Sequence, residues 1–381
     1  MSGSDPLRYP SLDGIRGIAI ILVLLQNLQE GLPLDFVGGH LFGVVRQTGW
    51  VGVQLFFVLS GFLITDGLLR SQGAANYYRS FYARRTLRIF PLYYATLAVL
   101  FVLLPLVGAQ PARLAETAQN QAWYWLYLSN WAQPLGYGVF GLAHFWSLAV
   151  EEQFYLVWPF VMLRIVPSRL VWITLAIALA ALLIRVAMRL AGVAPDMVYQ
   201  FTVCRMDALA LGACVAALLR VGVARAWIVA RVSRLYLVAG SLLAITFLVT
   251  SGFAVDDLST QTLGDSALSV GFAIAVLAAV LVDRGRPMQR LLSLRALRFM
   301  GKYSYGIYVI HLPLHAFLGA ALAGALGLAT LRAGALYYLL VLSGISIACA
   351  VVSYHVLERP FLRMKNRFAP DERLATGERA A

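Results

Sequence analysis

The chain has 381 residues, of which 60% are hydrophobic and only 13% are charged. Its mean hydropathy of +0.75 excludes an ordinary soluble domain and predicts an integral membrane protein. The net charge of +13 comes from basic residues in short runs between apolar segments rather than on one polar domain, which argues against nucleic-acid binding.

Apolar segments recur along the whole chain, and a helix needs roughly 20 such residues to span a bilayer. The sequence therefore predicts an all-α, polytopic membrane bundle of about ten transmembrane helices. They are expected near 14–30, 50–69, 90–108, 146–166, 170–190, 206–222, 234–251, 265–282, 304–326 and 334–356. The connection 109–143 is rich in Trp and Tyr, which predicts a position at the membrane interface.

Arginine and lysine concentrate in alternate connections. They gather after the second, sixth and eighth segments and in the C-terminal tail, and only the stretch 185–205 breaks the alternation. The positive-inside rule then places both termini in the cytoplasm. We expect residues 1–360 to form the transmembrane domain and residues 361–381 a disordered polar tail.

The first predicted helix carries charge near one end and an amide near the other. Asp13 and Arg16 are three residues apart, so they share a helix face and are expected to pair, either within the membrane or at its interface. Asn27 follows Arg16 by eleven residues, about three turns and about 16 Å along the same face. Arg16 is therefore expected near the cytoplasmic end and Asn27 in the outer half.

The next two segments contribute polar groups and a basic cluster. In VGVQLFFVLSGFLIT, Gln54 and Ser60 are the strong polar residues, and the Ser-Gly step favours close helix packing over chemistry. The stretch RRTLRIFPLYY carries Arg84, Arg85 and Arg88 at the cytoplasmic entrance of the third helix. Arginine forks bind phosphates well, although plain positive-inside topology explains the same residues.

The segment HFWSLAVEEQFYLVWP holds adjacent carboxylates, Glu151 and Glu152, within an apolar helix. Two unpaired carboxylates would be costly in lipid, so both are candidates for function. His144 lies two turns before Glu151 on the same face, and the whole group is predicted in the outer half, near the depth of Asn27.

In GKYSYGIYVIHLPLH, His311 and His315 are four residues apart, a spacing that suits a metal. With no third ligand nearby we expect no metal site, and His311 is interpreted as a polar residue that lines a cavity. The three cysteines show no disulfide or metal-ligand spacing.

Together these segments resemble the acyltransferase-3 family of membrane O-acyltransferases over about residues 9–360. The matching stretches are SLDGIRGIAI, VGVQLFFVLSGFLIT, RRTLRIFPLYY, HFWSLAVEEQFY, RMDALALGA, GKYSYGIYVIHLPL and SYHVLERPF. The resemblance implies a protein of the bacterial inner (plasma) membrane. It would transfer an acyl group, usually acetyl, from cytoplasmic acyl-CoA to a hydroxyl of a glycan, lipid-linked sugar or small-molecule natural product. We expect the membrane domain alone, without the esterase-like domain that some relatives carry.

The resemblance also implies roles for individual residues, with the basic cluster on the CoA phosphates and Arg16 orienting the donor. The predicted substrate-binding residues are Arg84, Arg85, Arg88, Ser60, Tyr155, Tyr305 and His311. The predicted catalytic positions are Asn27, Glu151, Glu152, Arg16, Asp13 and His144.

One position departs from the family pattern. The family's first helix carries arginine, ten residues and then a histidine, and that histidine position is Asn27 here, with Gln26 beside it. Asparagine cannot act as a general base or form an acyl-imidazole. Three explanations stay open: an engineered inactive variant, a natural non-catalytic protein such as a transporter or glycolipid-binding protein, or relocation of the role to Glu151, Glu152 or His144.

Overall fold

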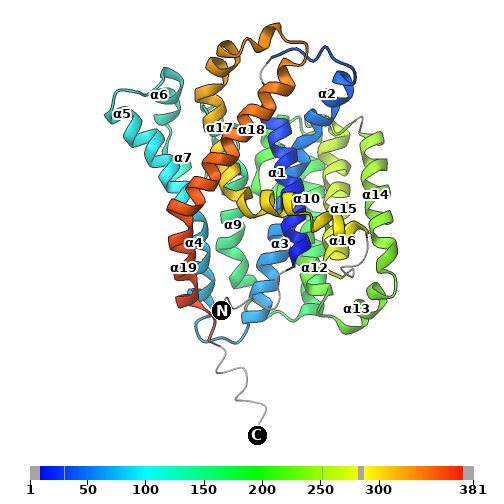
Figure 1. Cartoon of the computed structure of the whole chain (residues 1–381). Helices are drawn as coiled ribbons and strands as arrows, with labels where there is room; N and C mark the ends of the chain where they lie inside the picture. The colour runs from blue at the N-terminus through cyan, green and yellow to red at the C-terminus, as the bar shows by residue number, and fades with distance from the viewer. Residues whose placement is uncertain (1–8, 30, 251, 282–286, 372–381) are drawn as a thin grey trace.

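The computed structural model describes residues 9–29, 31–250, 252–281 and 287–371. Within these ranges the chain forms helices and connecting turns, without a β-strand. The long helices run beside one another as a bundle, with α1 in its middle (Figure 1). Two parts of the predicted basic connections, 282–286 and 372–381, lie outside the described residues.

Each of the ten predicted segments contains a long helix. The long helices are α1 (Pro10–Asn27), α3 (Val51–Ser71), α4 (Tyr77–Ala98), α9 (Phe145–Met162), α10 (Pro167–Leu190), α12 (Thr202–Leu218), α14 (Val232–Val249), α15 (Asp265–Leu281), α17 (Arg295–Ala325) and α18 (Gly334–Ser353). The short α-helices are α2 (Gly39–Gln47), α5 (Leu104–Leu106), α6 (Ala112–Ala118), α7 (Ala122–Trp125), α8 (Ser129–Ala132), α11 (Pro195–Gln200), α13 (Gly222–Val229), α16 (Pro287–Leu292) and α19 (Arg359–Met364). Single 3₁₀ or π turns are η1 (Thr48–Trp50), η2 (Val99–Leu103), η3 (Thr260–Gly264), η4 (Leu328–Thr330), η5 (Tyr354–Glu358) and η6 (Lys365–Phe368).

Seven helical stretches of the described residues are long and apolar enough to cross a membrane, or up to eight if the bent pair α13–α14 forms one span. The remaining two predicted segments are α1 and α9, whose charged residues lower their hydropathy although both lie within the bundle (Figure 1). Large apolar side chains face outward, among them Trp172 and Leu179 of α10. These features confirm the polytopic helical membrane fold.

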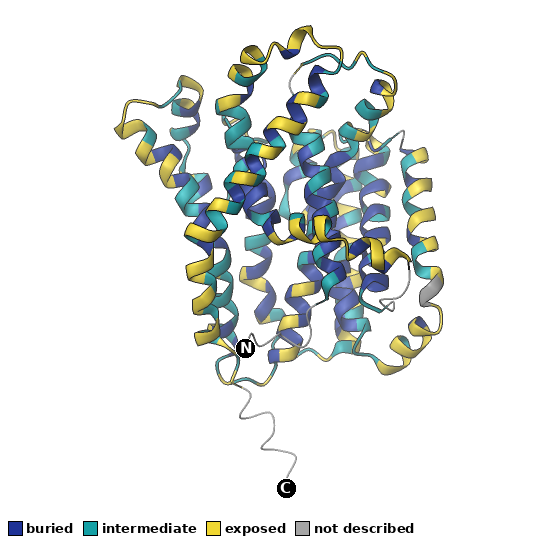
Figure 2. Ribbon diagram, viewed as in Figure 1, coloured by how far each residue is buried: buried dark blue, intermediate teal, exposed yellow. Residues whose placement is uncertain are grey.

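Burial divides the helices into an inner and an outer set (Figure 2). Most residues of α3 and α12 are buried, whereas α19 has no buried residue. The aromatic connection between α5 and α9 is partly internal, because Tyr93 of α4 donates a hydrogen bond to the Tyr124 carbonyl at 2.7 Å and stacks on Tyr127. Its position at the membrane interface stays a prediction.

Glycine contacts bring α1 and α17 together backbone to backbone. A Cβ atom on Gly17 would lie 2.1 Å from the Leu297 carbonyl oxygen, and one on Gly301 would lie 1.8 Å from the Asp13 carbonyl oxygen. Small residues permit this close approach where helices associate in a membrane. The contact fixes the polar face of α1 against α17.

Close backbone contacts at glycines also join α3 to α12. A Cβ on Gly61 would lie 1.9 Å from the Leu209 carbonyl oxygen, and one on Gly212 would lie 2.0 Å from that of Val58. The prediction that Ser60 and its neighbouring glycine mark close helix packing is therefore confirmed.

The helical chain continues beyond residue 360 through α19 and η6. Ser80 of α4 donates to the Phe368 carbonyl at 2.8 Å, and Asn76 donates to the Ala369 carbonyl at 2.9 Å. The expectation of disorder is thus wrong for residues 361–371, because polar groups at the start of α4 bind their backbone. The beginning of α1 and the end of α19 lie at the same end of the bundle (Figure 1).

Replacement of Gly61 by Ala should destabilise the protein by about 1–3 kcal/mol, since the new methyl group meets backbone that cannot move aside. Gly67→Ala on the same helix is the matched control, because nothing lies within 4 Å of its Cβ position. Thermal unfolding in detergent measures both variants. Equal unfolding temperatures for the two would contradict this account of the α3–α12 contact.

Candidate active site

Two cavities lie at different depths along α1. The larger has a volume of about 350 Å³ and is lined by Arg16, and the smaller has a volume of about 190 Å³ and is lined by Asn27. The eleven-residue step between these residues corresponds to about 16 Å of helix. The predicted separation of the two groups along the first helix therefore appears as two distinct cavities.

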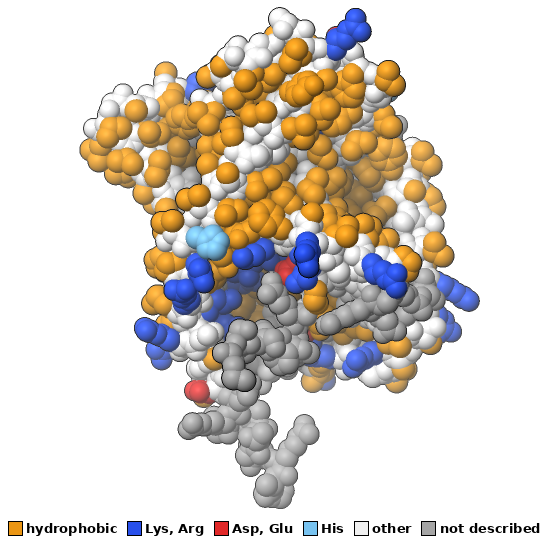
Figure 3. Space-filling model, in the orientation of Figure 1, with side chains coloured by type: hydrophobic (Ala, Val, Ile, Leu, Met, Phe, Trp, Pro, Cys, Tyr) orange, Lys and Arg blue, Asp and Glu red, His pale blue; other side chains and the backbone are white. Residues whose placement is uncertain are grey.

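We call the larger one the arginine cavity. Its charged lining residues are Arg16, Arg84, Arg85, Arg88, Glu151, Glu152 and Lys365. Among the described residues, five basic side chains thus face two acidic ones. Because Lys365 belongs to η6, the cavity lies toward the end of the bundle where α19 ends. Basic side chains gather around that end of the surface (Figure 3).

Arg16 is held in this cavity by α17. Its Nη2 donates a hydrogen bond to Ser304 Oγ at 3.1 Å, and Ser304 in turn donates to the Gly301 carbonyl at 3.0 Å. The close glycine contact between α1 and α17 makes this short reach possible. The pairing of Arg16 with Asp13 stays a prediction.

Three further predicted residues gather around the arginine cavity. The Arg85 guanidinium lies 4.5 Å from the centre of the Tyr155 ring, a cation–π arrangement. The Tyr155 hydroxyl is hydrogen-bonded to Ser60 Oγ. Tyr305 also lines the cavity and donates to the Ile89 carbonyl at 2.5 Å. Residues far apart in the chain thus form one polar surface.

We call the smaller cavity the histidine pocket, after His144 in its wall. Asn27 Nδ2 lies 2.9 Å from His311 Nε2, while His311 Nδ1 lies 2.7 Å from the Tyr308 carbonyl oxygen. A carbonyl only accepts, so His311 carries its proton on Nδ1, and the Asn27 amide donates to Nε2. The rings of His144 and His311 are 4.8 Å apart.

The structure separates two predicted neighbours. His144 lies in the histidine pocket with Asn27, whereas Glu151 and Glu152 line the arginine cavity. The expectation that the whole group lies at the depth of Asn27 is therefore wrong for the glutamates. Seven residues of helix keep one face but advance about 10 Å, which carries the carboxylates toward Arg16.

His311 and His315 have different partners despite their spacing. His311 bonds Asn27, whereas His315 Nδ1 lies 2.6 Å from the Tyr338 hydroxyl. Within the described ranges, no group of three His, Cys, Asp or Glu side chains is arranged to hold a metal ion.

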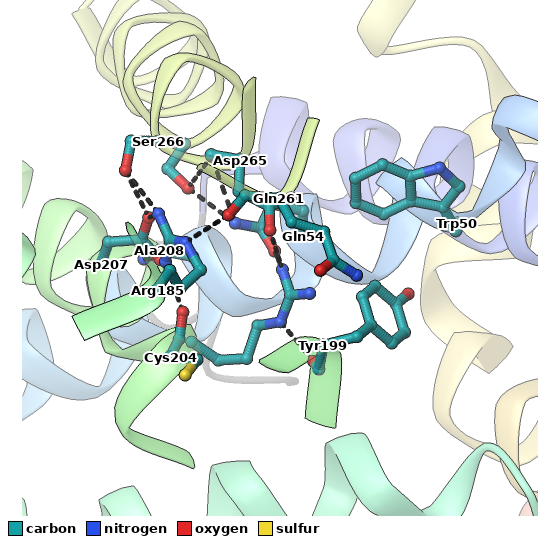
Figure 4. A network of polar contacts seen from close by, with 12 residues as sticks. Trp50, Gln54, Arg185, Tyr199, Cys204, Asp207, Ala208, Gln261, Asp265 and Ser266 are labelled. Atoms are coloured by element: carbon teal, nitrogen blue, oxygen red, sulfur yellow. Dashed lines mark hydrogen bonds and ion pairs between the residues drawn. The ribbon is translucent and has the colours of Figure 1, made fainter. Parts of the chain in front are cut away.

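The stretch 185–205 broke the alternation of basic loops because two of its three arginines, Arg185 and Arg205, are internal. Arg185 Nη2 lies 2.7 Å from Asp207 Oδ2, and Arg205 Nη1 lies 2.9 Å from Asp265 Oδ2, with all four side chains at most 1% exposed. Ser266 and Gln54 extend the network to a second contact on each arginine (Figure 4). The pairs tie α10, α12 and α15 together.

This network also supports the histidine pocket. Arg205 Nε donates to the Tyr199 carbonyl at 2.6 Å, and its guanidinium lies 4.3 Å from the centre of the Tyr199 ring. Tyr199 packs against Trp50 and Trp146 at centroid distances of 5.8 and 4.9 Å, and all three line the pocket. The buried ion pair therefore holds one aromatic wall of the pocket.

Sequence reasoning did not select Tyr308, Trp50, Tyr199 or the two ion pairs as part of a site. The ion pairs could have been predicted from the sequence, since charge within apolar helices is costly and requires a partner. No sequence feature singled out the aromatic residues, because Trp and Tyr are common throughout this chain.

Comparison with known proteins now places the chain. Residues 9–355 match the family of the Acyltransferase domain, the family suggested by the sequence motifs. The chain belongs to this acyltransferase family. No solved structure matches it significantly.

Curated relatives from this family are bacterial O-acetyltransferases. The chain is 29% identical to a peptidoglycan O-acetyltransferase of Listeria monocytogenes over 321 residues, covering 80% of this chain and 49% of the relative. It is 32% identical to a putative peptidoglycan O-acetyltransferase of Bacillus subtilis, covering 80% and 48%. For an O-acetyltransferase of Staphylococcus aureus the identity is 27%, covering 83% and 52%. The chain thus spans about half the length of these relatives.

Removal of one partner from a buried ion pair should be strongly destabilising. Asp265→Ala leaves Arg205 charged and uncompensated inside the bundle, at an expected cost of about 3–5 kcal/mol. The double variant Arg205→Met, Asp265→Leu should recover most of that loss, since it removes both charges. Unfolding temperatures in detergent test this.

Asp257→Ala is the control, because Asp257 is exposed and its hydroxyl partner is the nearby Ser259. It should change the free energy of unfolding by less than about 0.5 kcal/mol. A stable Asp265→Ala variant would show that the pair does not hold α12 to α15.

Proposed function

We propose that this protein is a membrane O-acyltransferase that moves an acyl group, most simply acetyl, from acyl-CoA to a hydroxyl of a glycan. The observation that carries the proposal is the arginine cavity, where basic residues from α1 and α4 outnumber the carboxylates of α9. A cavity of about 350 Å³ is within the range of small-molecule sites. The O-acetyltransferase names of the relatives support the same chemistry.

The donor would bind in the arginine cavity. Arg84, Arg85 and Arg88 lie on neighbouring turns of α4, and arginine forks make charge-assisted hydrogen bonds to phosphate oxygens. The pyrophosphate of CoA is such a group. Glu151 and Glu152 would limit the repulsion among these arginines and keep Arg16 in place near the thioester.

The membrane orientation follows from the donor. Acyl-CoA is a cytoplasmic metabolite, so the end of the bundle that holds η6 and the arginine cavity would face the cytoplasm. The start of α1 and the end of α19 lie at that end (Figure 1), and the positive-inside pattern agrees. We therefore propose that both termini are cytoplasmic in a bacterial inner (plasma) membrane.

The acceptor would bind in the histidine pocket. Its wall combines the aromatic faces of Trp50, Trp146 and Tyr199 with the polar side chains of Asp196 and Asp256. Flat apolar faces beside hydrogen-bonding groups suit a pyranose ring, which has apolar C–H faces and hydroxyl edges. Among the expected acceptors we favour a glycan or lipid-linked sugar over a small natural product.

Asn27 favours a second candidate function. Without a histidine at this position the same two cavities could serve a non-catalytic transporter or glycolipid-binding protein. The two candidates differ in one respect that can be measured, since only the enzyme releases CoA thiol as it forms an ester.

Donor binding should depend on the arginine cluster. Arg88→Gln is expected to weaken acetyl-CoA binding by about 10–100-fold, the equivalent of about 1.5–3 kcal/mol for a lost charge-assisted hydrogen bond. Arg298→Gln, exposed at the start of α17, should bind like the wild type. Calorimetric titration of purified protein measures both, and equal affinities would contradict the donor site.

Acyl transfer itself can be followed in vesicles that contain the purified protein, labelled acetyl-CoA and peptidoglycan glycan fragments. The wild type should produce acetyl ester and free CoA thiol. Glu151→Gln and Glu152→Gln should each abolish transfer, because each removes one of the two counter-charges of the cavity arginines. Glu116→Gln, exposed in α6, is the control. Turnover that survives in both cavity variants would exclude a required glutamate.

A further inference from the structure

We propose that His144 is the catalytic base of this chain, in the role that the family's first-helix histidine would fill at position 27. The inference rests on the proposed acyl transfer and adds to it the residue that activates the acceptor. It follows from the hydrogen bonds of the histidine pocket, which leave one suitable nitrogen.

His144 is held in a single tautomer. Its Nε2 lies 3.3 Å from the Val309 carbonyl oxygen, and because a carbonyl only accepts, Nε2 carries the proton. In the neutral ring Nδ1 then carries the lone pair. This atom is buried and has no hydrogen-bond partner within the described part of the chain, although the residue lines the histidine pocket. A base that is oriented by a backbone carbonyl on one nitrogen and unpartnered on the other has a lone pair ready to accept a proton. An acceptor hydroxyl that bonds Nδ1 would have to displace the side chains that cover this atom.

The other candidates for the base either have hydrogen-bond partners already or lie outside the pocket. His311 is fully buried, donates from Nδ1 to the Tyr308 carbonyl, and accepts from Asn27 at Nε2. The Asn27 amide nitrogen is used in that contact, so its carbonyl oxygen remains to accept from a second hydroxyl of the acceptor. Glu151 and Glu152 lie in the arginine cavity.

The two cavities share a wall, and His144 is tied to it. Val53 and Tyr308 line both cavities. The Tyr308 hydroxyl donates to the His144 carbonyl oxygen at 3.0 Å and lies 2.5 Å from Ser147 Oγ. A thioester that reaches this wall from the arginine cavity would therefore meet an acceptor hydroxyl beside His144.

The step balances without a further reactant. The acceptor oxygen attacks the thioester carbonyl carbon, and its proton passes to His144 Nδ1 as the C–O bond forms. The C–S bond then breaks, and the CoA thiolate leaves and takes the proton from His144. The products are the acetyl ester and CoA thiol, and the histidine is neutral again.

The test compares His144→Gln with His315→Gln in the vesicle assay. His315 is the matched control, because it lies on α17 and contacts Tyr338 rather than either cavity. His144→Gln should lose about 100-fold or more of the transfer rate, the usual contribution of a general base, while its acetyl-CoA affinity stays unchanged. Added imidazole should restore part of the rate to His144→Ala. Transfer by folded His144→Gln at a rate close to that of the control would overturn the proposal.

Asn27→His separates failure of this proposal from failure of the proposed function. If the wild type shows no acetyl transfer and Asn27→His does, His144 is not a base, but the fold is that of an acyltransferase. If both are silent while acetyl-CoA binds, the proposed function itself fails. Transfer by the double variant Asn27→His, His144→Gln, where His144→Gln alone is inactive, would support the exchange of one base for the other.

Discussion

The cost of charge inside a membrane bundle governs the arrangement of this structure. Arg185 with Asp207 and Arg205 with Asp265 satisfy that cost by pairing, and in doing so they fix α10, α12 and α15 against one another. The charged side chains of Arg16, of the α4 arginines and of Glu151 and Glu152 line a cavity instead. The ion pairs and the arginine cavity are thus two solutions to one constraint, the first structural and the second suited to an anionic ligand.

α1 is the element that relates the two cavities. Its glycine contacts with α17 hold it in one position, and its length sets the spacing between Arg16 and Asn27. The wall formed by Val53 and Tyr308 is common to both cavities. Under the proposed function, a donor bound from one end and an acceptor bound from the other would meet at this wall without either crossing the membrane.

Much of the fold could be predicted from the sequence, because hydropathy and positive-inside charge report directly on helices in lipid. The sequence also indicated the arginine cluster of α4 and singled out Glu151 as a candidate residue. It placed that glutamate at the wrong depth, since helical periodicity gives the face of a residue but not which neighbouring helix it meets. The prediction of disorder for residues 361–371 was wrong for a similar reason, because their hydrogen-bond partners at the start of α4 are distant in the chain.

The sequence by itself determined the helical membrane architecture, the family motifs and the absence of histidine at position 27. Only the tertiary structure decided which polar residues meet, because helices far apart in the chain supply each side of every contact. It paired Asn27 with His311 and left the buried Nδ1 of His144 without a hydrogen-bond partner among the described residues. Hydrogen-bond partners fix the tautomer of a histidine, and those partners are a property of packing rather than of local sequence.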